Sequence, residues 1–138
     1  MAKDRFHQVV KTALIEDGWD ITHDPLQIKV GGVDMEIDLG AEQLLAAERE
    51  NEKIAVEVKS FLTQASAISE FHTALGQFIN YRAALRLEDP SRTLYLAVPE
   101  WTDNSFFQLD FPASMLREND VKLMVYDIES ERIVQWKT

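Results

Sequence analysis

The chain has 138 residues, of which 46% are hydrophobic, so we expect one folded domain that spans residues 1–138. It contains no cysteine, which excludes disulfide scaffolds, thiolate nucleophiles and cysteine zinc sites. The net charge of −10, from 14 basic and 24 acidic residues, weighs against a general affinity for nucleic acid, because binding to phosphates needs basic contacts.

The first part of the sequence predicts one helix followed by short strands. Residues 3–17 carry an apolar stripe at helical spacing, and Gly18 is typical of a helix end. Extended segments are expected at 19–22, 26–30 and 33–39. Residues 41–50 are rich in helix formers, so we expect a helix there, between two strands that carry acidic side chains.

The second part predicts one long helix among further strands. This helix is expected to begin after Ser69, a plausible N-cap, and to reach Leu87. Residues 101–119 predict one or two short helices. The remaining strands are expected at 54–59, 93–98, 121–128 and 132–137.

The coarse order of elements is α-β-β-β-α-β-(α)-β-β, which favours an α/β (α+β) fold with a central mixed sheet flanked by helices. No apolar run is long enough to span a bilayer, and residues 1–8 are too polar for a signal segment. We therefore expect no contact with a membrane and a cytoplasmic location.

The strand at 54–59 carries the most informative pattern. Because successive strand residues face opposite sides, one face carries Ile54, Val56 and Val58, and the other carries Ala55, Glu57 and Lys59. The preceding strand can bring Asp38 to the second face. Two carboxylates suit Mg²⁺ or Mn²⁺, which prefer oxygen ligands and keep waters for a substrate phosphate.

A chemical role can be assigned to each residue of this cluster. Asp38 and Glu57 would bind the metal, and the carbonyl of Val58 could add a third oxygen. Lys59 could position or activate a metal-bound water and offset negative charge in the transition state. The cluster would thus suit phosphodiester hydrolysis.

A simpler interpretation of this pattern stays open. Glu57-Val58-Lys59 is also typical of the solvated face of a sheet. Gln77 flanks the apolar stripe of the long helix, with Tyr81 one turn later, and could reach over the sheet towards Glu57. Gln77 could equally be a boundary residue that makes an ordinary hydrogen bond.

Two other groups of residues suggest binding surfaces. Arg82 and Arg86 follow Gln77 on the long helix and could meet DNA or an acidic partner. Four aromatic residues form either a protein interface or a local flap of the core, namely Trp101, Phe106, Phe107 and Phe111. No nucleotide-binding, nucleophile-elbow or histidine metal-site motif is found in the sequence.

Five blocks, in order along nearly the whole chain, carry a family resemblance: Lys3–His7, Ala13–Trp19, Ile37–Glu42, Ile54–Phe61 and Ala74–Phe78. They resemble the XisH family, whose members are called fdxN element excision controlling factors. That cyanobacterial family is named for a programmed DNA excision during heterocyst differentiation, in which a separate recombinase cuts and these proteins are accessory. Its usual companion is the small XisI family, which implies an XisI-like protein partner.

XisH-like proteins are in turn similar to the restriction-endonuclease-like PD-(D/E)XK superfamily. This resemblance implies that Asp38 is the first acidic position, that Glu57 and Lys59 form the E-x-K pair, and that Gln77 is the glutamine on the following helix. It assigns these four residues as catalytic and Asp38, Glu57 and Val58 as metal ligands. Ile37 stands in place of the proline of this pattern, at a position where many members vary.

Two functions follow from the resemblance and from the composition. The first is a controlling factor for programmed excision of a DNA element, built on a nuclease-type fold, that acts with a partner and meets DNA directly or through partners. The alternative is an active Mg²⁺-dependent DNA endonuclease or nickase. The acidic chain and the accessory role of the family favour the first function, whereas the complete acid-acid-lysine set favours the second.

Overall fold

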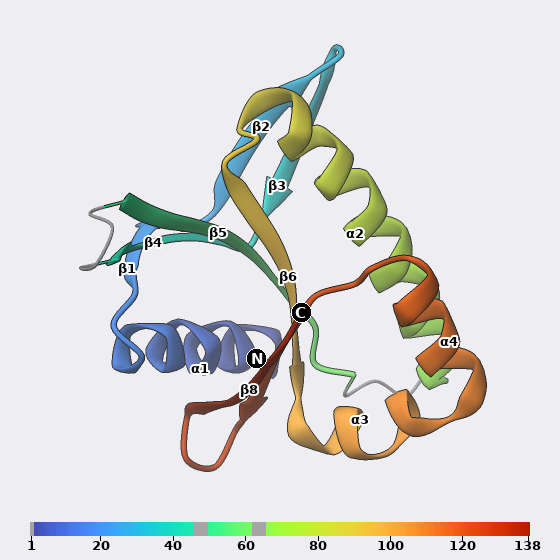
Figure 1. Ribbon diagram of the computed structural model, residues 1–138. Coiled ribbons are helices and arrows are strands. Elements are labelled where there is room, and N and C mark those ends of the chain that lie inside the picture. The colour runs from blue at the N-terminus through green and yellow to red at the C-terminus, as the bar shows by residue number, and fades with distance from the viewer. Residues whose placement is uncertain (1, 46–49, 62–65) are drawn as a thin grey trace.

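The centre of the structure is a mixed β-sheet, seen in a computed structural model that describes residues 2–45, 50–61 and 66–138 (Figure 1). In chain order the elements are α1 (Ala2–Glu16), β1 (Asp20–His23), β2 (Leu26–Val30), β3 (Val33–Ile37), β4 (Leu39–Leu45), β5 (Glu50–Val58), α2 (Ala67–Glu88), β6 (Arg92–Pro99), α3 (Glu100–Asn104), the 3-10 helix η1 (Phe106–Gln108), α4 (Asp110–Glu118), β7 (Leu123–Asp127) and β8 (Arg132–Lys137). None of the helices in these described residues is long and apolar enough to cross a bilayer.

Six strands of the described chain form the main sheet, in the order β1-β4-β5-β6-β7-β8. The three central strands, β5, β6 and β7, run parallel, and the outer pairs are antiparallel. Strands β2 and β3 form a separate antiparallel hairpin. The parallel strands are joined by crossovers through α2 and through α3, η1 and α4, as parallel pairing requires. The predicted central mixed sheet with helices is confirmed.

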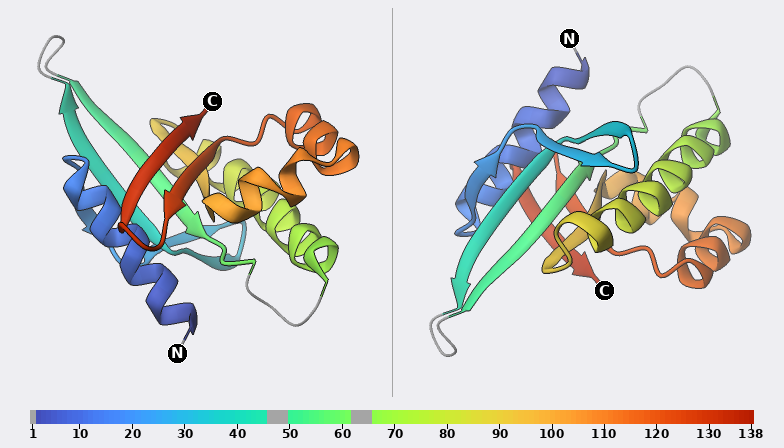
Figure 2. Two further views of the ribbon diagram at one scale, coloured as in Figure 1. Left: turned by 90° about the horizontal axis from the view of Figure 1, so that it is seen from below. Right: turned by 90° about the horizontal axis from the view of Figure 1, so that it is seen from above.

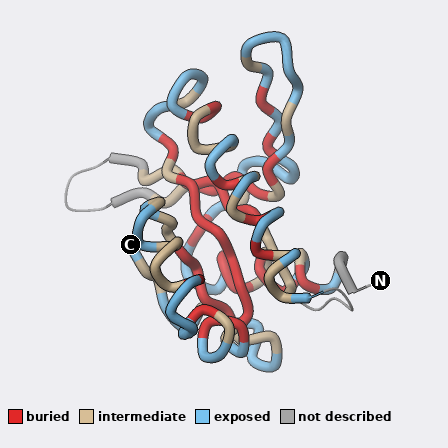
Figure 3. Tube along the Cα trace, turned by 90° about the vertical axis from the view of Figure 1, so that its right-hand side faces the viewer, coloured by how far each residue is buried: buried red, intermediate tan, exposed pale blue. Residues whose placement is uncertain are grey.

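Hydrophobic cores lie on both faces of this sheet. Figures 1 and 2 show α1 and α2 on opposite faces, and Figure 3 shows the buried residues gathered in the middle of the molecule. The α2 face packs Phe71, Phe78 and Leu85 against Ala55, Leu96 and Val98. The α1 face packs Phe6, Val10 and Leu14 against Ile54, Val56 and Tyr126. Both faces of β5 are therefore buried, which decides the environment of any polar side chain on it.

The ends of the two long helices have clear local causes. Gly18, with φ of 92°, lets the chain turn after α1, and the Trp19 N–H donates to the Leu14 carbonyl at 3.0 Å. The predicted helix over 3–17 is confirmed. The N-cap of α2 is Ser66, whose hydroxyl accepts from the Ser69 N–H at 3.4 Å. The prediction of Ser69 as the cap is wrong, because Ser69 already lies in the first turn.

The helix predicted over 41–50 is wrong. Leu39–Leu45 forms β4 and Glu50 begins β5, while residues 46–49 lie outside the described residues. Strand β4 pairs with β1 on one side and β5 on the other, so that Ala41 lies opposite both Ile21 and Ile54. Pairing on both edges, with Ala41 fully buried, outweighs the helix propensity of the local sequence.

The strand predicted over 33–39 is divided at Asp38 in the structure. Strand β3 pairs with β2, whereas β4 pairs with β5 in the main sheet, so the chain changes partners at this residue. As a result, five strands separate α1 from α2 in the described residues, and the predicted element order is wrong there. The change of partners places Asp38 at a junction between two sheets.

The aromatic segment divides between the two roles left open for it. Phe106 and Phe107 pack against Phe71, with ring centroids 5.7 and 5.9 Å apart, and Phe107 also packs against Phe61 at 5.4 Å. These two residues therefore belong to a flap of the core. Trp101 and Phe111 remain 42% and 58% exposed.

Candidate functional site

The candidate site lies where β3 gives way to β4, beside the carboxyl end of β5. Leu39 of β4 lies opposite Val56 of β5, and this is the last residue pair between these two strands at the carboxyl end of β5. Asp38 and Glu57 are the next residues beyond this pair. The change of strand partners at Asp38 and the end of β5 thus bring the two carboxylates to one place.

Two hydrogen bonds connect Asp38 with Glu57 and Val58 at the end of β5. The Val58 N–H donates to Oδ2 of Asp38 at 2.8 Å, and the Asp38 N–H donates to Oε1 of Glu57 at 3.3 Å. Asp38 therefore supplies the acceptor that a continuing strand would otherwise give to Val58. Each carboxylate is held by a backbone N–H of the opposite segment, which fixes the separation of the two segments.

Glu57 lies inside the molecule rather than on a wet face. Its side chain shares the α2 face of β5 with Ala55, and the residue is 6% exposed. The solvated-face interpretation of the Glu57-Val58-Lys59 pattern is therefore wrong. A buried carboxylate must be paired or hydrogen-bonded to be tolerated, and both conditions hold here.

Lys59 completes the contacts of Glu57. Its Nζ lies 3.6 Å from Oε2 of Glu57, and its side chain is 16% exposed. The Lys59 N–H donates to the Ala97 carbonyl at 2.9 Å, and its carbonyl accepts from the Tyr126 hydroxyl at 3.3 Å. Neighbouring strands thus hold the Lys59 backbone in place, while its ammonium faces the acidic pair.

The electrostatics of the cluster favour a proton on Glu57. Burial and, to a smaller extent, the negative charge of Asp38 together raise the pKa of Glu57 to about 7, against the opposing effect of the Lys59 ammonium. A carboxyl with a pKa this high changes charge near neutral pH. Strongly perturbed carboxyls of this kind are concentrated at functional sites.

Helix α2 carries Tyr81 and the predicted Gln77, which makes no hydrogen bond to Asp38, Glu57 or Lys59 among the described residues. Oε1 of Gln77 is buried and has no hydrogen-bond partner among the described residues. The pKa of the Tyr81 hydroxyl is raised by burial and by the charges of Glu57, Asp38 and Glu36. Tyr81 therefore lies within electrostatic reach of the acidic pair, a role that the sequence indicated only through its position one turn after Gln77.

The donor set is compatible with a divalent cation of the magnesium type. Within residues 2–45, 50–61 and 66–138, no group of three or more His, Asp or Glu side chains is placed to hold a metal ion. Mg²⁺, however, commonly uses one or two carboxylates and fills its other positions with water and phosphate oxygens. Asp38 and Glu57 offer two such carboxylates, and a cation between them would offset the repulsion that raises the pKa of Glu57.

Comparisons with known proteins place the chain in a family. A search of curated proteins gave no match. Among solved structures, an XisH family protein from Nostoc punctiforme PCC 73102 is similar, with a TM-score of 0.91 and 62% identity over 98% of this chain and 100% of that chain. An fdxN element excision controlling factor protein from Anabaena variabilis has a TM-score of 0.90 and 62% identity over 98% of this chain and 99% of that chain.

The family model described as XisH protein matches residues 1–134, almost the full length of the chain. Both solved relatives agree with this match over their whole lengths. The chain therefore belongs to the XisH family.

Proposed function

We propose that this protein is a controlling factor for the excision of a DNA element and that it acts together with a small XisI-like protein. The observation that carries this proposal is the 62% identity, over 98% of the chain, to a protein named an fdxN element excision controlling factor. The net charge of −10 supports a partner-dependent role, because a chain with this charge is poorly suited to hold DNA by itself.

We propose in addition that the cluster of Asp38, Glu57 and Lys59 is a pocket of the PD-(D/E)XK type on a restriction-endonuclease-like fold. Asp38 and Glu57 would hold Mg²⁺ or Mn²⁺ through their carboxylates, and Val58 would add its carbonyl. When bound, the ion would stabilise charge on a phosphate and lower the pKa of a bound water. The burial of Glu57, at 6% exposure, supports this role, since strand carboxylates without a function usually face solvent.

A second candidate function is cleavage of DNA by this same pocket, as an Mg²⁺-dependent endonuclease or nickase. The contact of 3.6 Å between Lys59 and Glu57 favours it, because the ammonium lies where it can also meet a phosphate held by the acidic pair. Gln77 would orient the phosphate or the water with its amide, whose Oε1 has no partner among the described residues.

The test of both functions uses the purified chain with and without its XisI-like partner. Supercoiled and branched DNA are incubated with Mg²⁺ or Mn²⁺, and nicking is compared between wild type, Asp38→Ala, Glu57→Ala and Lys59→Ala. Glu88→Ala, which removes an exposed carboxylate from the end of α2, is the matched control. Nicking by wild type and by Glu88→Ala that all three site variants lose would establish the nuclease.

The controlling role has its own readout. The rate at which the recombinase excises its element is measured with and without the chain and its partner. We expect the chain to change this rate only when the partner is present. An unchanged rate, together with no co-purification of the two proteins, would contradict the controlling role. Absence of nicking, together with absence of metal binding in calorimetry, would exclude the enzyme.

A further inference from the structure

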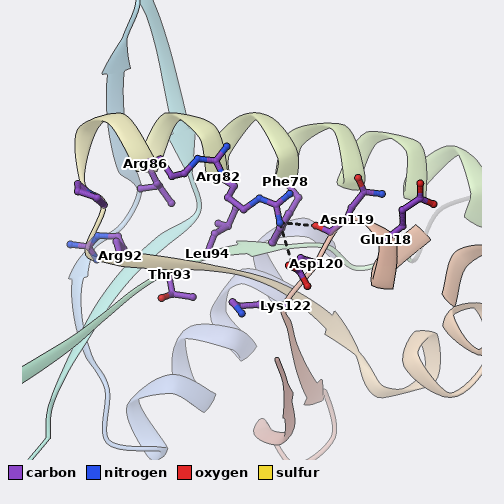
Figure 4. Close-up of a pocket in the computed structure, with 12 residues that line it drawn as sticks. Phe78, Arg82, Arg86, Arg92, Thr93, Leu94, Glu118, Asn119, Asp120 and Lys122 are labelled. Carbon is purple, nitrogen blue, oxygen red and sulfur yellow. Dashed lines mark hydrogen bonds between the residues drawn. The ribbon is translucent and has the colours of Figure 1, made fainter. Parts of the chain in front are cut away.

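A pocket of about 450 Å³ lies at the opposite end of the central strands from Glu57. Its walls are the second half of α2, the first residues of β6 and the segment between α4 and β7 (Figure 4). Glu57 lies opposite Leu96 near the carboxyl end of β5, whereas the pocket begins at Arg92, the first residue of the parallel strand β6. Its volume is in the range of small-molecule sites.

Basic side chains dominate the pocket. Apart from Arg92, which pairs with an acidic residue outside the lining, the charged lining residues are Arg82, Arg86, Lys122, Glu118 and Asp120, a small positive excess in a chain of net charge −10. None of these five side chains makes an ion pair within 4.0 Å in the described part of the chain. The three cations are therefore available to an external anion.

Arg82 is held in position by neutral groups. Its Nη1 donates to the carbonyls of Asn119 and Asp120 at 2.7 and 3.1 Å, and its guanidinium lies over the Phe78 ring at 5.2 Å (Figure 4). Its Nε is buried and has no acceptor among the described residues. A fixed guanidinium whose charge is met only by dipoles and a ring favours an anion nearby, and little side-chain entropy is lost on binding.

Arg92 has a different role at the same end of β6. Its side chain is 3% exposed and bonds to Asp89 at 3.0 Å and to the Ile54 carbonyl at 2.8 Å. Its charge is thus already neutralised by a partner on the protein. Arg92 therefore lines the pocket without being one of the groups that would hold a ligand.

We propose that this pocket binds a phosphate monoester. A tetrahedral phosphate presents several oxygens that can accept from the cations lining this pocket, and the planar guanidinium fork of arginine matches it well. A monoester carries between one and two negative charges at neutral pH, which suits a site with a small positive excess. The volume exceeds that of the phosphate alone, and apolar lining from Leu85, Pro90 and Leu94 suits an organic part.

Duplex DNA fits these observations less well. A duplex places one negative charge about every 1.7 Å along its axis, so it needs a broad basic face, and this chain is acidic overall. A phosphate monoester occurs both in small molecules and at the 5′ end of a nucleic acid strand. The two sources share one chemistry and are separated by experiment.

The test measures binding of inorganic phosphate and adenosine 5′-monophosphate by calorimetry and by amide NMR shifts. The double variant Arg86→Gln/Lys122→Gln removes two pocket cations whose side chains make no hydrogen bond or ion pair with described residues. Its matched control, Lys29→Gln/Arg132→Gln, removes two exposed cations outside the pocket. We expect saturable binding of both probes, weakened about tenfold or more in the pocket variant and unchanged in the control.

Three further probes complete the design. Adenosine, which lacks the phosphate, should not bind. A single-stranded oligonucleotide with a 5′ phosphate is compared with the same strand without it, and a preference for the phosphorylated strand over the nucleotide assigns the site to strand ends. No binding of either phosphate probe at about 10 mM would overturn the proposal. The proposal would also be overturned if both double variants weakened binding of the phosphate probes equally. It would be overturned as well if Arg86 and Lys122 were needed for binding of duplex DNA but not of the phosphate probes.

Discussion

Two effects of the fold act in opposite directions on the charge of the Glu57 side chain. The strand alternation and the packing of α2 bury the side chain, and burial favours the neutral carboxyl. The contacts with Lys59 and with the Asp38 N–H favour the carboxylate. The first effect is stronger, and the pKa of Glu57 lies at about 7. A site that keeps such a carboxyl gives up stability at neutral pH unless a cation binds there.

This conflict predicts a pH dependence of stability. The carboxyl has its ordinary pKa of 4.5 in the unfolded chain and about 7 in the folded protein. Between these values the folded state keeps a proton that the unfolded state releases, so the free energy of unfolding falls as pH rises, by up to roughly 3 kcal/mol. Glu57→Gln cannot lose this proton. Urea denaturation should therefore find the variant more stable than wild type at pH 8, by about 2 kcal/mol, and similar to it at pH 4.5.

The control for this prediction is Glu88→Gln, which neutralises an exposed carboxylate at the end of α2. Its difference from wild type should stay within about 0.5 kcal/mol at both pH values. If Glu57→Gln were less stable than wild type at pH 8, the raised pKa of Glu57 would be wrong.

The proposed binding of Mg²⁺ to the acidic pair predicts a second stability change. A cation that binds only the folded state stabilises it by about 1.4 kcal/mol when present at tenfold its dissociation constant. Mg²⁺ should therefore raise the melting temperature of wild type but not of Asp38→Asn. Each Mg²⁺ sample is matched in ionic strength with NaCl, because screening of the net charge of −10 also stabilises the chain. An equal gain in Asp38→Asn would show that the ion binds elsewhere.

At the scale of elements, the alternation or helical spacing of apolar residues is sufficient to predict a strand or helix that buries one face. The strand at 132–137 and the helices at the start and in the middle of the chain could be predicted in this way. The segment 41–50 could not, because its strand is stabilised by β1 and β5, which are distant partners with no local signal.

The candidate site was predictable to a similar degree. Alternation and the family resemblance brought Asp38, Glu57 and Lys59 together, and the structure places these residues in contact. The division of one strand into β3 and β4 was not predictable, since it depends on the pairing of each half with a different sheet. Helical spacing put Tyr81 near Gln77, but its electrostatic coupling to the acidic pair needed the packing of α2.

The different surroundings of Gly40 and Gly76 predict opposite effects of an added methyl group on stability. Gly40 is buried in β4, and an added Cβ would lie 3.1 Å from the His23 ring nitrogen Nδ1 and 3.2 Å from Nη1 of Arg92. Gly40→Ala should therefore displace Arg92 from the Ile54 carbonyl and lower the free energy of unfolding by about 1–2 kcal/mol. Urea denaturation measures this loss.

The matched substitution is Gly76→Ala in the middle of α2. Its Cβ would meet no atom within 4 Å, and alanine is the better helix former, so the variant should gain about 0.5–1 kcal/mol. A stable Gly40→Ala variant would mean that β4 can shift against β1 without cost.

At the scale of the whole molecule, the two ends of the central strands differ in charge. The acidic pair lies at the carboxyl end of β5, and the pocket with Arg82, Arg86 and Lys122 lies at the amino end of β6. The chain as a whole is acidic, with a net charge of −10. Because the chain is acidic, we expect no general attraction to DNA, whatever the two sites bind.

The net negative charge predicts how the chain alone behaves with DNA. Binding of a duplex releases counterions in proportion to the phosphates that are neutralised, and a chain with 24 acidic and 14 basic residues neutralises few. At about 150 mM salt, the chain alone should not retard random duplex DNA in gel shifts at micromolar concentration. Retardation should appear when the XisI-like partner is added, and should persist in Asp38→Asn, since the acidic pair is not needed for binding. Retention of duplex by the chain alone, with a steep salt dependence, would show that it has a basic DNA-binding face and that the partner is not required for contact with DNA.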